Sequence, residues 1–302
     1  MVEVCLLGSG GMMPLPNRWL TALLYRYNGK MVLVDCGEGT QIPVKLAGWG
    51  FKNIEVICIT HYHADHIAGL PGMLLAIGNS GRREPLTILG PPMLNDVVQG
   101  LTIIARELPF EMKLIELSGE IPTTNSVGEI LIHSIPVEHT MPCLSYSIEI
   151  KRAGKFHVEM AKKYNIPIQF WSRLQKGEII QHKNQTYFPA MVLGEPRKGI
   201  KVSYCTDTRP IEALVDFVRE SDLLICEGMY GEEEKLEKAI EKKHMIFSEA
   251  ATIAQKGCVK ELWLTHYSPA LENPEKFYDN AKSIFANTVL GEDLLRKTIY
   301  FE

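Results

Sequence analysis

Residues 60–66 (Thr-His-Tyr-His-Ala-Asp-His) bring three imidazoles and one carboxylate into seven consecutive positions. The apolar, β-branched run before them predicts a buried strand, and the residues after them predict a turn into a helix. Side chains two residues apart on an extended segment point the same way, so His61 and His63 can bind one ion. The turn then directs Asp65 and His66 towards a neighbouring position. Because imidazole and carboxylate groups are the usual ligands of catalytic zinc, we expect a metal site at this strand end.

Metal-type side chains also follow short apolar runs elsewhere in the chain. They are His139, Asp207, Glu227 and His266. Two divalent ions about 3.5–4 Å apart need about seven ligands and a shared bridge. The expected ligands are His61, His63 and His139 for the first ion, Asp65, His66 and His266 for the second, and Asp207 as the bridging carboxylate. A water held by both ions should ionise near neutral pH and become the nucleophile. Manganese and iron accept the same ligands as zinc.

The spacing of apolar residues predicts an α/β chain made of two similar halves. In the first half, strands are expected at 2–7, 20–27, 31–35, 54–59, 84–92, 115–117, 130–137 and 145–150, and helices at 42–48, 67–76 and 94–105. In the second half, strands are expected at 200–205, 223–227, 261–265 and 299–301, and helices at 210–220, 232–243 and 247–256. Asn28-Gly29 predicts a tight hairpin turn. Gly37 and Gly39 either let the backbone approach the metal crevice closely or serve turn geometry alone, and the sequence leaves both readings open.

The composition of the chain is that of an ordinary globular protein, with 302 residues, 46% of them hydrophobic and 23% charged. No apolar stretch approaches the roughly 20 residues of a membrane helix, and the first residues lack the basic region of a signal peptide. The seven cysteines are scattered and include no Cys-x-x-Cys pair. Because this pattern argues against a disulfide framework, we expect a protein of the reducing cytoplasm without a membrane partner.

Basic residues are concentrated between 151 and 198, where ten lysines and arginines face three glutamates. This segment therefore carries a formal charge of +7 in a chain whose net charge is −4. It also lacks a sustained hydrophobic period, with a helix expected at 158–164 and polar turns towards 196, so we expect an inserted arm at 152–197 that projects from the body. A basic segment on an acidic body is a candidate footprint for a polyanion, although charge alone equally fits a solvated surface insertion.

Five segments together resemble the metallo-β-lactamase superfamily and, more narrowly, its ribonuclease Z family of tRNA 3′-processing endonucleases. They are 35–41 (Asp-Cys-Gly-Glu-Gly-Thr-Gln), 60–66, 137–140 (Val-Glu-His-Thr), 206–210 (Thr-Asp-Thr-Arg-Pro) and 264–268 (Leu-Thr-His-Tyr-Ser). The His-x-His-x-Asp-His pattern is specific to the superfamily only, whereas 35–41 and 206–210 point to the ribonuclease branch. The resemblance covers nearly the whole chain.

This resemblance implies one αββα sandwich domain over 1–302 with an inserted arm that grips tRNA, two zinc ions per subunit, and a homodimer. It also places Glu227 and His244 as a catalytic pair, in which His244 is oriented by Glu227 and protonates the leaving 3′-oxygen. Asp65 would bind metal and help to activate the water. The implied activity is a zinc-dependent endoribonuclease that cuts precursor tRNA by metal-bound hydroxide attack and leaves a 3′-hydroxyl.

The chain departs from the family pattern at positions expected to meet RNA. It has Cys-Glu-Gly-Met at 226–229, Met-Ile at 245–246 and Ala-Leu at 270–271, where the family has His-Glu-Ala-Thr, Ser-Thr and Arg-Tyr. Two alternatives therefore accompany the main interpretation. One is a paralogous metallo-phosphodiesterase that acts on a different RNA or a cyclic nucleotide, and the other is a nucleic-acid-binding protein with weakened catalysis.

Overall fold

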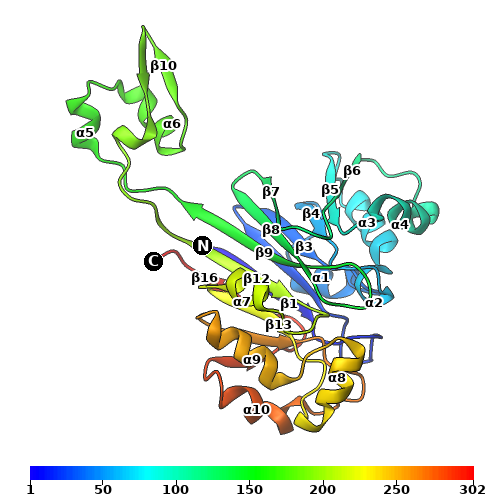
Figure 1. Cartoon of the computed structure of the whole chain (residues 1–302). Coiled ribbons are helices and arrows are strands. Elements are labelled where there is room, and N and C mark those ends of the chain that lie inside the picture. The colour runs from blue at the N-terminus through cyan, green and yellow to red at the C-terminus, as the bar shows by residue number, and fades with distance from the viewer. The chain divides into compact units, whose positions relative to one another are not determined.

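Two seven-stranded sheets build the first compact unit, residues 1–149 and 201–300, of the computed structural model, which describes all 302 residues (Figure 1). The first sheet contains, in spatial order, β16 (Leu295–Ile299), β1 (Val2–Gly8), β2 (Ala22–Tyr27), β3 (Lys30–Val34), β4 (Ile54–Cys58), β5 (Leu86–Gly90) and β6 (Met112–Glu116). The second contains β15 (Thr288–Leu290), β14 (Leu262–Thr265), β13 (Leu223–Glu227), β12 (Arg197–Cys205), β9 (Cys143–Arg152), β8 (Ile130–Val137) and β7 (Thr123–Val127).

Parallel strands bring distant parts of the chain to one edge of each sheet. β3, β4, β5 and β6 are parallel in the first sheet, and β12, β13, β14 and β15 are parallel in the second. The carboxyl ends of parallel strands meet at the same edge, which is where α/β sheets bind ligands. The predicted hairpin turn between β2 and β3 is confirmed, because Asn28 and Gly29 have φ angles of 48° and 78°, as a type I′ turn requires.

Helices cover the outer faces of the two sheets (Figure 1). Those packed on the first sheet are α1 (Gln41–Ala47), α3 (Leu70–Asn79) and α4 (Leu94–Leu101), and those on the second are α7 (Glu212–Val218), α9 (Phe247–Lys256) and α10 (Tyr278–Lys282). Leu33 of β3 shares a core with Met73 of α3, and Leu264 of β14 shares another with Leu214 and Ala250 of the helices. Burying one such leucine contributes about 1.5–3 kcal/mol. This order of layers confirms the expected αββα sandwich.

Hydroxyl groups join the inner faces of the two sheets. Thr21 Oγ1 lies 2.7 Å from Thr265 Oγ1, and the Tyr146 hydroxyl donates to the Ile59 carbonyl at 2.7 Å. Buried hydroxyls need such partners, so these hydrogen bonds fix how the sheets face one another.

Short elements complete this unit. They are α2 (Ala64–Ile67), α8 (Leu236–Lys242), and the 3₁₀ helices η1 (Thr102–Ile104), η4 (Glu233–Lys235) and η5 (Pro274–Phe277).

The second compact unit comprises residues 150–200 and 301–302 and thus includes the segment expected as an arm. Its elements are α5 (Val158–Lys163), η2 (Ile168–Phe170), α6 (Trp171–Gln175), β10 (Ile180–His182), β11 (Gln185–Tyr187) and η3 (Pro189–Met191). Seven buried side chains, among them Phe170, Leu174 and Tyr187, form a small core of its own. The expectation of polar turns after the first helices is therefore corrected, because Lys183 and Asn184 adopt positive φ and close a β10–β11 hairpin over this core.

Several boundaries in the first unit differ from expectation. The helix expected at 210–220 begins only at Glu212, and the last strand is β16, four residues earlier than expected. β7 and β15 were not expected, because both are short edge strands and β7 consists of Thr-Thr-Asn-Ser-Val. No helix combines the length and apolar character that crossing a membrane requires.

Candidate metal centre

Three residues that follow strand ends adopt a left-handed backbone. Asp35, Asp207 and His266 follow β3, β12 and β14, and their φ angles are 62°, 49° and 61°. This conformation is uncommon for residues other than glycine, although aspartate and histidine tolerate it better than most. It turns the chain sharply as each strand ends and points the three side chains towards the region between the sheets.

Glycines permit the close backbone contacts beneath the centre. A Cβ atom on Gly37 would lie 2.0 Å from the Asp65 carbonyl oxygen, so no other residue fits there. A Cβ atom on Gly39 would make only an ordinary contact with the Trp19 ring, at 3.4 Å, but the Gly39 φ of 79° serves the turn into α1. Close approach of the backbone therefore explains Gly37, and turn geometry explains Gly39.

The first group consists of His61, His63 and His139. His61 Nε2 lies 3.0 Å from His63 Nδ1, which in turn lies 3.2 Å from His139 Nε2. With Asp207, these side chains offer four ligand atoms that all lie within 4.8 Å of one another. His139 comes from the loop after β8, so two sheets contribute to this group.

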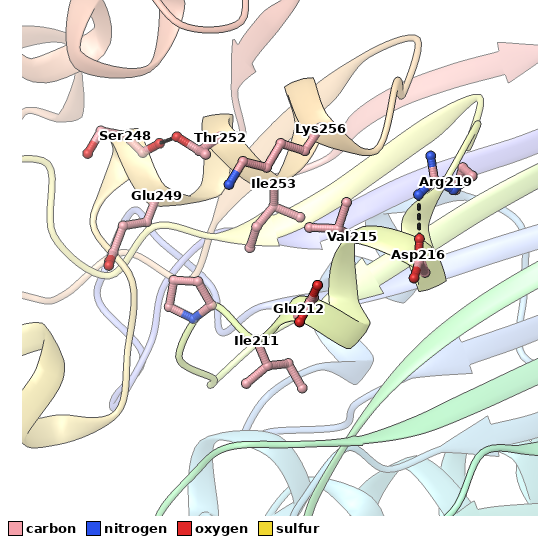
Figure 2. A pocket seen from close by; sticks show the side chains of 11 residues that line it. Ile211, Glu212, Val215, Asp216, Arg219, Ser248, Glu249, Thr252, Ile253 and Lys256 are labelled. Carbon is pink, nitrogen blue, oxygen red and sulfur yellow. Dashed lines mark hydrogen bonds and ion pairs between the residues drawn. The ribbon is translucent and has the colours of Figure 1, made fainter.

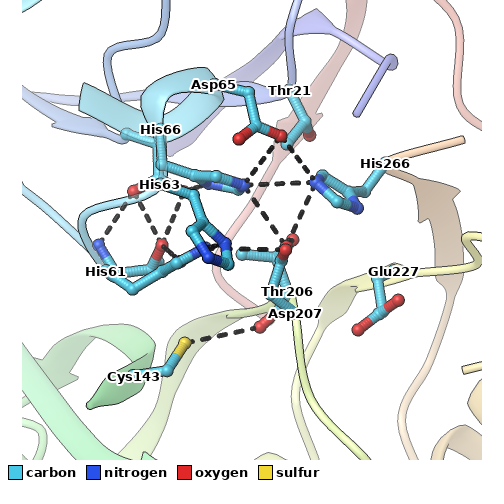
Figure 3. Close-up of polar contacts among 12 residues, drawn as sticks. Thr21, His61, His63, Asp65, His66, Cys143, Thr206, Asp207, Glu227 and His266 are labelled. Carbon is cyan, nitrogen blue, oxygen red and sulfur yellow. Dashed lines mark hydrogen bonds and ion pairs between the residues drawn. The ribbon is translucent and has the colours of Figure 1, made fainter. Parts of the chain in front are cut away.

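The second group consists of Asp65, His66 and His266 (Figure 3). His66 Nε2 lies 3.1 Å from His266 Nε2, and Asp65 Oδ2 lies 3.4 Å from each of these nitrogens. Asp65 Oδ2 also accepts the Met12 N–H at 2.6 Å. The three ligand atoms again lie within 4.8 Å of one another.

Asp207 lies between the two groups and turns one oxygen towards each. Its Oδ1 is 3.3 Å from His66 Nε2 and 3.2 Å from His266 Nε2. Its Oδ2 is 3.6 Å from His61 Nε2 and 3.8 Å from His139 Nε2. A carboxylate in this position can serve two cations at once, which is the geometry of a two-metal site.

Outer hydrogen bonds fix which nitrogen faces inward in three of the five imidazoles of these two groups. His66 Nδ1 lies 2.8 Å from Asp35 Oδ2, and His139 Nδ1 lies 3.2 Å from the Lys243 carbonyl oxygen. His61 Nδ1 lies 3.1 Å from the Thr60 hydroxyl, which itself donates to Asp35. An N–H used outward leaves a lone pair on the inward nitrogen. Several lone pairs and carboxylate oxygens thus converge, and this donor set fits divalent cations.

The electrostatics of the centre agree with that donor set. Burial lowers the pKa of His61 well below its ordinary value, and His66 adds to the shift. Burial opposes ionisation of Asp207, but His266 and His66 outweigh it and hold the pKa of this carboxyl well below its usual range. Burial likewise opposes a charge on His66, but Asp207 and Asp35 raise its pKa. The bridge position is therefore ionised and the first group offers neutral imidazole.

Glu227 and His244 form a second polar pair at the edge of the centre. His244 Nδ1 lies 3.1 Å from Glu227 Oε2, and the fully buried Glu227 also accepts the N–H groups of Thr208 and Met245 at 2.6 and 3.1 Å. Burial opposes a charge on His244, but Glu227 outweighs it and raises the pKa of His244 to about 9. Because Nδ1 is held by Glu227, Nε2 is the nitrogen that remains for a substrate.

The centre opens into a cavity of about 620 Å³. Its lining includes His63, Asp65, His139, Asp207, His244 and His266. A second cavity of about 650 Å³ lies between α7 and α9 (Figure 2), and it contains no histidine. Its polar contacts are ordinary ones, such as the ion pair between Asp216 of α7 and Arg219, the residue that follows this helix. Chemistry rather than size therefore identifies the first cavity as the candidate site.

The structure brings all nine predicted site residues to this one place. Sequence reasoning missed the outer partners, of which Asp35 could have been found, since it follows a strand end as Asp207 does. It also missed Arg209, which binds Glu249 through two contacts and donates to the His244 carbonyl. The Arg209 N–H donates to the Glu138 carbonyl at 3.0 Å, so this residue links the loops that carry His139, Asp207 and His244.

Comparisons with known proteins found a matching family model and relatives similar over the full length of the chain. The family model described as "Anti-Pycsar protein Apyc1" matches residues 2–288. The ribonuclease Z of Clostridium acetobutylicum is 55% identical over 307 residues, covering 100% of this chain and 99% of that protein. The ribonuclease Z of Clostridium kluyveri is 54% identical over 302 residues and covers 100% of both chains.

Solved structures share the fold at lower identity. The short form of human tRNase Z superposes with a TM-score of 0.71 at 23% identity, covering 99% of this chain and 100% of that one. The metallo-β-lactamase fold protein YhfI from Bacillus subtilis gives a TM-score of 0.70 at 19% identity, covering 98% of both chains. These two likenesses concern the fold alone.

Proposed function

Because the chain belongs to the ribonuclease Z family, we propose that it is an endoribonuclease that cuts precursor tRNA 3′ of the acceptor stem and leaves a 3′-hydroxyl on the tRNA. The observation that supports this most is Asp207, which presents one oxygen to each of two ligand groups. A carboxylate shared in this way is suited to holding two divalent ions about 3.5–4 Å apart, the spacing used for phosphodiester hydrolysis. The ribonuclease Z relatives, at 55% and 54% identity over the full length, supply the substrate class.

The residues that would hold the two ions are those already grouped. His61, His63 and His139 would bind one ion, Asp65, His66 and His266 the other, and Asp207 both. The proposed metal is zinc, two ions per subunit, and manganese or iron would also accept these ligands. When bound, such ions polarise phosphate oxygens and lower the pKa of water towards about 7.

His244 is the proposed general acid. Its raised pKa, about 9, keeps its imidazole protonated at neutral pH. Glu227 holds Nδ1, so Nε2–H can be donated to the leaving 3′-oxygen. Asp65 has its Oδ2 engaged by the Met12 N–H and by His266, and in this proposal its carboxylate would bind metal and help to activate the attacking water.

The second compact unit is the proposed tRNA-binding arm, within which we place the boundaries at 152–197. It carries exposed basic side chains, including Lys162, Lys163, Lys176 and Lys183. Contacts from such side chains to phosphates are independent of base sequence, and folded RNA is recognised largely by its shape. Deleting 152–197 should therefore abolish cleavage of precursor tRNA while hydrolysis of small phosphodiesters continues.

A homodimer is part of the proposal. α3 contacts both α1 and η1, and these three elements expose apolar side chains. The side chains are Ile42, Leu46, Leu75, Ile103 and Ile104. Exposed apolar side chains gathered on neighbouring elements are typical of an interface, and we assign these to contacts with a second copy of the chain. Light scattering after size-exclusion chromatography should give a dimer for the wild type and a monomer for Leu46→Glu.

We place the enzyme in the cytoplasm within this proposal. All seven cysteines are free and six of them are buried. Unpaired cysteines of this number are typical of a reducing compartment.

The test of the main proposal is incubation of the metal-loaded protein with an end-labelled precursor tRNA, followed by mapping of the cut. A single cut 3′ of the acceptor stem is expected. Hydrolysis of small diesters or cyclic nucleotides without tRNA cleavage would instead favour the paralogous phosphodiesterase. Bound metal and bound RNA without any turnover would favour a binding protein with weakened catalysis.

A further inference from the structure

One wall of the metal cavity carries positive charge. Lys238 and Lys242 both line the cavity, and both belong to α8. Residues four apart on a helix lie on the same face, with Cβ atoms about 5–6 Å apart. Both side chains are exposed and able to meet a ligand from solvent. The rest of the lining consists of side chains of the metal centre, His244 and residues without charge, such as Met12 and Thr140.

The two lysines are held differently, and both remain available. Lys238 Nζ lies 5.4 Å from the centroid of the Tyr230 ring, a cation–π distance, and Tyr230 is itself buried. Lys242 pairs with its neighbour Glu241 at 2.8 Å, and both side chains are more than half exposed. An exposed pair of this kind contributes about 0–1 kcal/mol, so an incoming anion can displace it.

The same helix is joined directly to the metal centre. α8 ends at Lys242 and is capped by Lys243, whose φ of 57° closes the helix and whose carbonyl oxygen lies 3.2 Å from His139 Nδ1. His244 follows at once and occupies the edge of the centre. A ligand bound by the two lysines would therefore share the cavity with His139, a residue of the first ligand group, and with His244, the proposed general acid.

We infer that Lys238 and Lys242 form an anion subsite that binds an RNA phosphate next to the scissile phosphodiester. The inference rests on the proposed function, because a polyanionic substrate is what gives these lysines a second phosphate to bind. Asp65 and Asp207 line the same cavity and would be engaged with the two ions in the proposed function, so the cationic groups of the lining that remain for a neighbouring phosphate include Lys238 and Lys242. A substrate with a single phosphodiester engages this subsite less than RNA does.

The test compares Lys238→Gln/Lys242→Gln with a matched control, Lys235→Gln, which changes the residue before α8 and lies outside the cavity lining. Binding of a short fluorescent single-stranded oligoribonucleotide to the metal-loaded protein is measured by anisotropy at several salt concentrations. Each phosphate that the protein neutralises contributes about 0.7 to the slope of log K against log salt, so the double variant, which loses one phosphate, should lose about 0.7. The control should keep the wild-type slope.

Kinetics provide the second readout. The double variant should raise KM for RNA at least tenfold more than it raises KM for bis(p-nitrophenyl) phosphate, which has one phosphodiester. Metal content and thermal unfolding should match the wild type, because both lysines are exposed. Should the double variant fold poorly, Lys242→Glu alone should weaken oligoribonucleotide binding more than Lys242→Gln does.

The outcomes separate this inference from the proposed function. An unchanged salt slope in the double variant overturns the subsite, whether or not the wild type cuts precursor tRNA. A reduced slope in the double variant, with no precursor tRNA cleavage by the wild type, supports the subsite and overturns the proposed substrate.

Discussion

The two ligand groups contribute equal numbers of side chains but differ in charge. The second group contains Asp65 and has Asp35 directly behind His66 at 2.8 Å. The first group contains only imidazoles, and its outer partners are the Thr60 hydroxyl and the Lys243 carbonyl. Asp207 is common to both. We therefore expect the second group to bind its cation more tightly, because more negative charge surrounds that position.

The difference also concerns exposure. In the second group, His66 and His266 are almost fully buried. In the first group, His61 is also almost fully buried, but His63 is only partly buried. A ligand that reaches solvent exchanges its ion more readily than one enclosed by packed side chains. The centre thus combines one enclosed, more negative position with one more open, less negative position, and four predictions test this comparison.

The largest effect is expected for Asp207→Ala, which removes the group that both positions share. Both ions should be lost and activity should fall at least about 10³-fold, because metal assistance contributes several kcal/mol and each 1.36 kcal/mol is a factor of ten. Metal content by mass spectrometry and the rate of cleavage measure this. Asp216→Ala, in an exposed ion pair on α7, should change neither. A variant that keeps both ions would remove Asp207 from the bridging role.

His244→Gln should separate catalysis from metal binding. The His244 ring centroid is 5.2 Å from that of His139 and 5.6 Å from that of His266, so it lies beside both groups. Both ions should be retained, while turnover falls about 10²–10⁴-fold through the loss of the general acid. Undiminished tRNA cleavage would show that His244 has no part in the reaction.

Asp35→Asn should act unequally on the two groups. The Asp35 carboxylate accepts directly from His66 but reaches His61 only through the Thr60 hydroxyl. Removing its charge should weaken cation binding about 10–100-fold at the second group and less at the first. Titration with cobalt, followed by its visible absorption, resolves the two steps. Equal weakening of both steps would contradict the proposed asymmetry.

The smallest change in cation affinity is expected for Asp65→Asn, which tests the comparison of charge. In the wild type, the dissociation constants of the two binding steps should differ by about tenfold or more, a modest fraction of the interaction free energy of one nearby charge. The variant should narrow this gap, because Asp207 is shared and Asp35 is then the one carboxylate that still distinguishes the second group. Calorimetric titration gives both constants, and an unchanged gap in the variant would assign the difference to burial instead.

Much of this centre could be predicted from the sequence, because local patterns encode it. Residues 60–66 stand together after an apolar run, and Asp207 and His266 each follow a strand end. A strand end fixes where a side chain emerges, and parallel strands share one edge, so the convergence follows from pattern and topology. Apolar periodicity likewise predicted an α/β chain in two halves, whereas the αββα sandwich was implied by the family resemblance and not by local pattern.

The tertiary structure alone decided the contacts between positions far apart in the chain. Which oxygen of Asp207 faces which group, the use of the Lys243 carbonyl by His139, and the link from Arg209 to His244 depend on how loops from both sheets pack. The same holds for the small core of residues 150–200 and for the lysines of α8 at the cavity wall. Sequence periodicity reports which face of an element is buried, but it carries no information about which distant partner lies against that face.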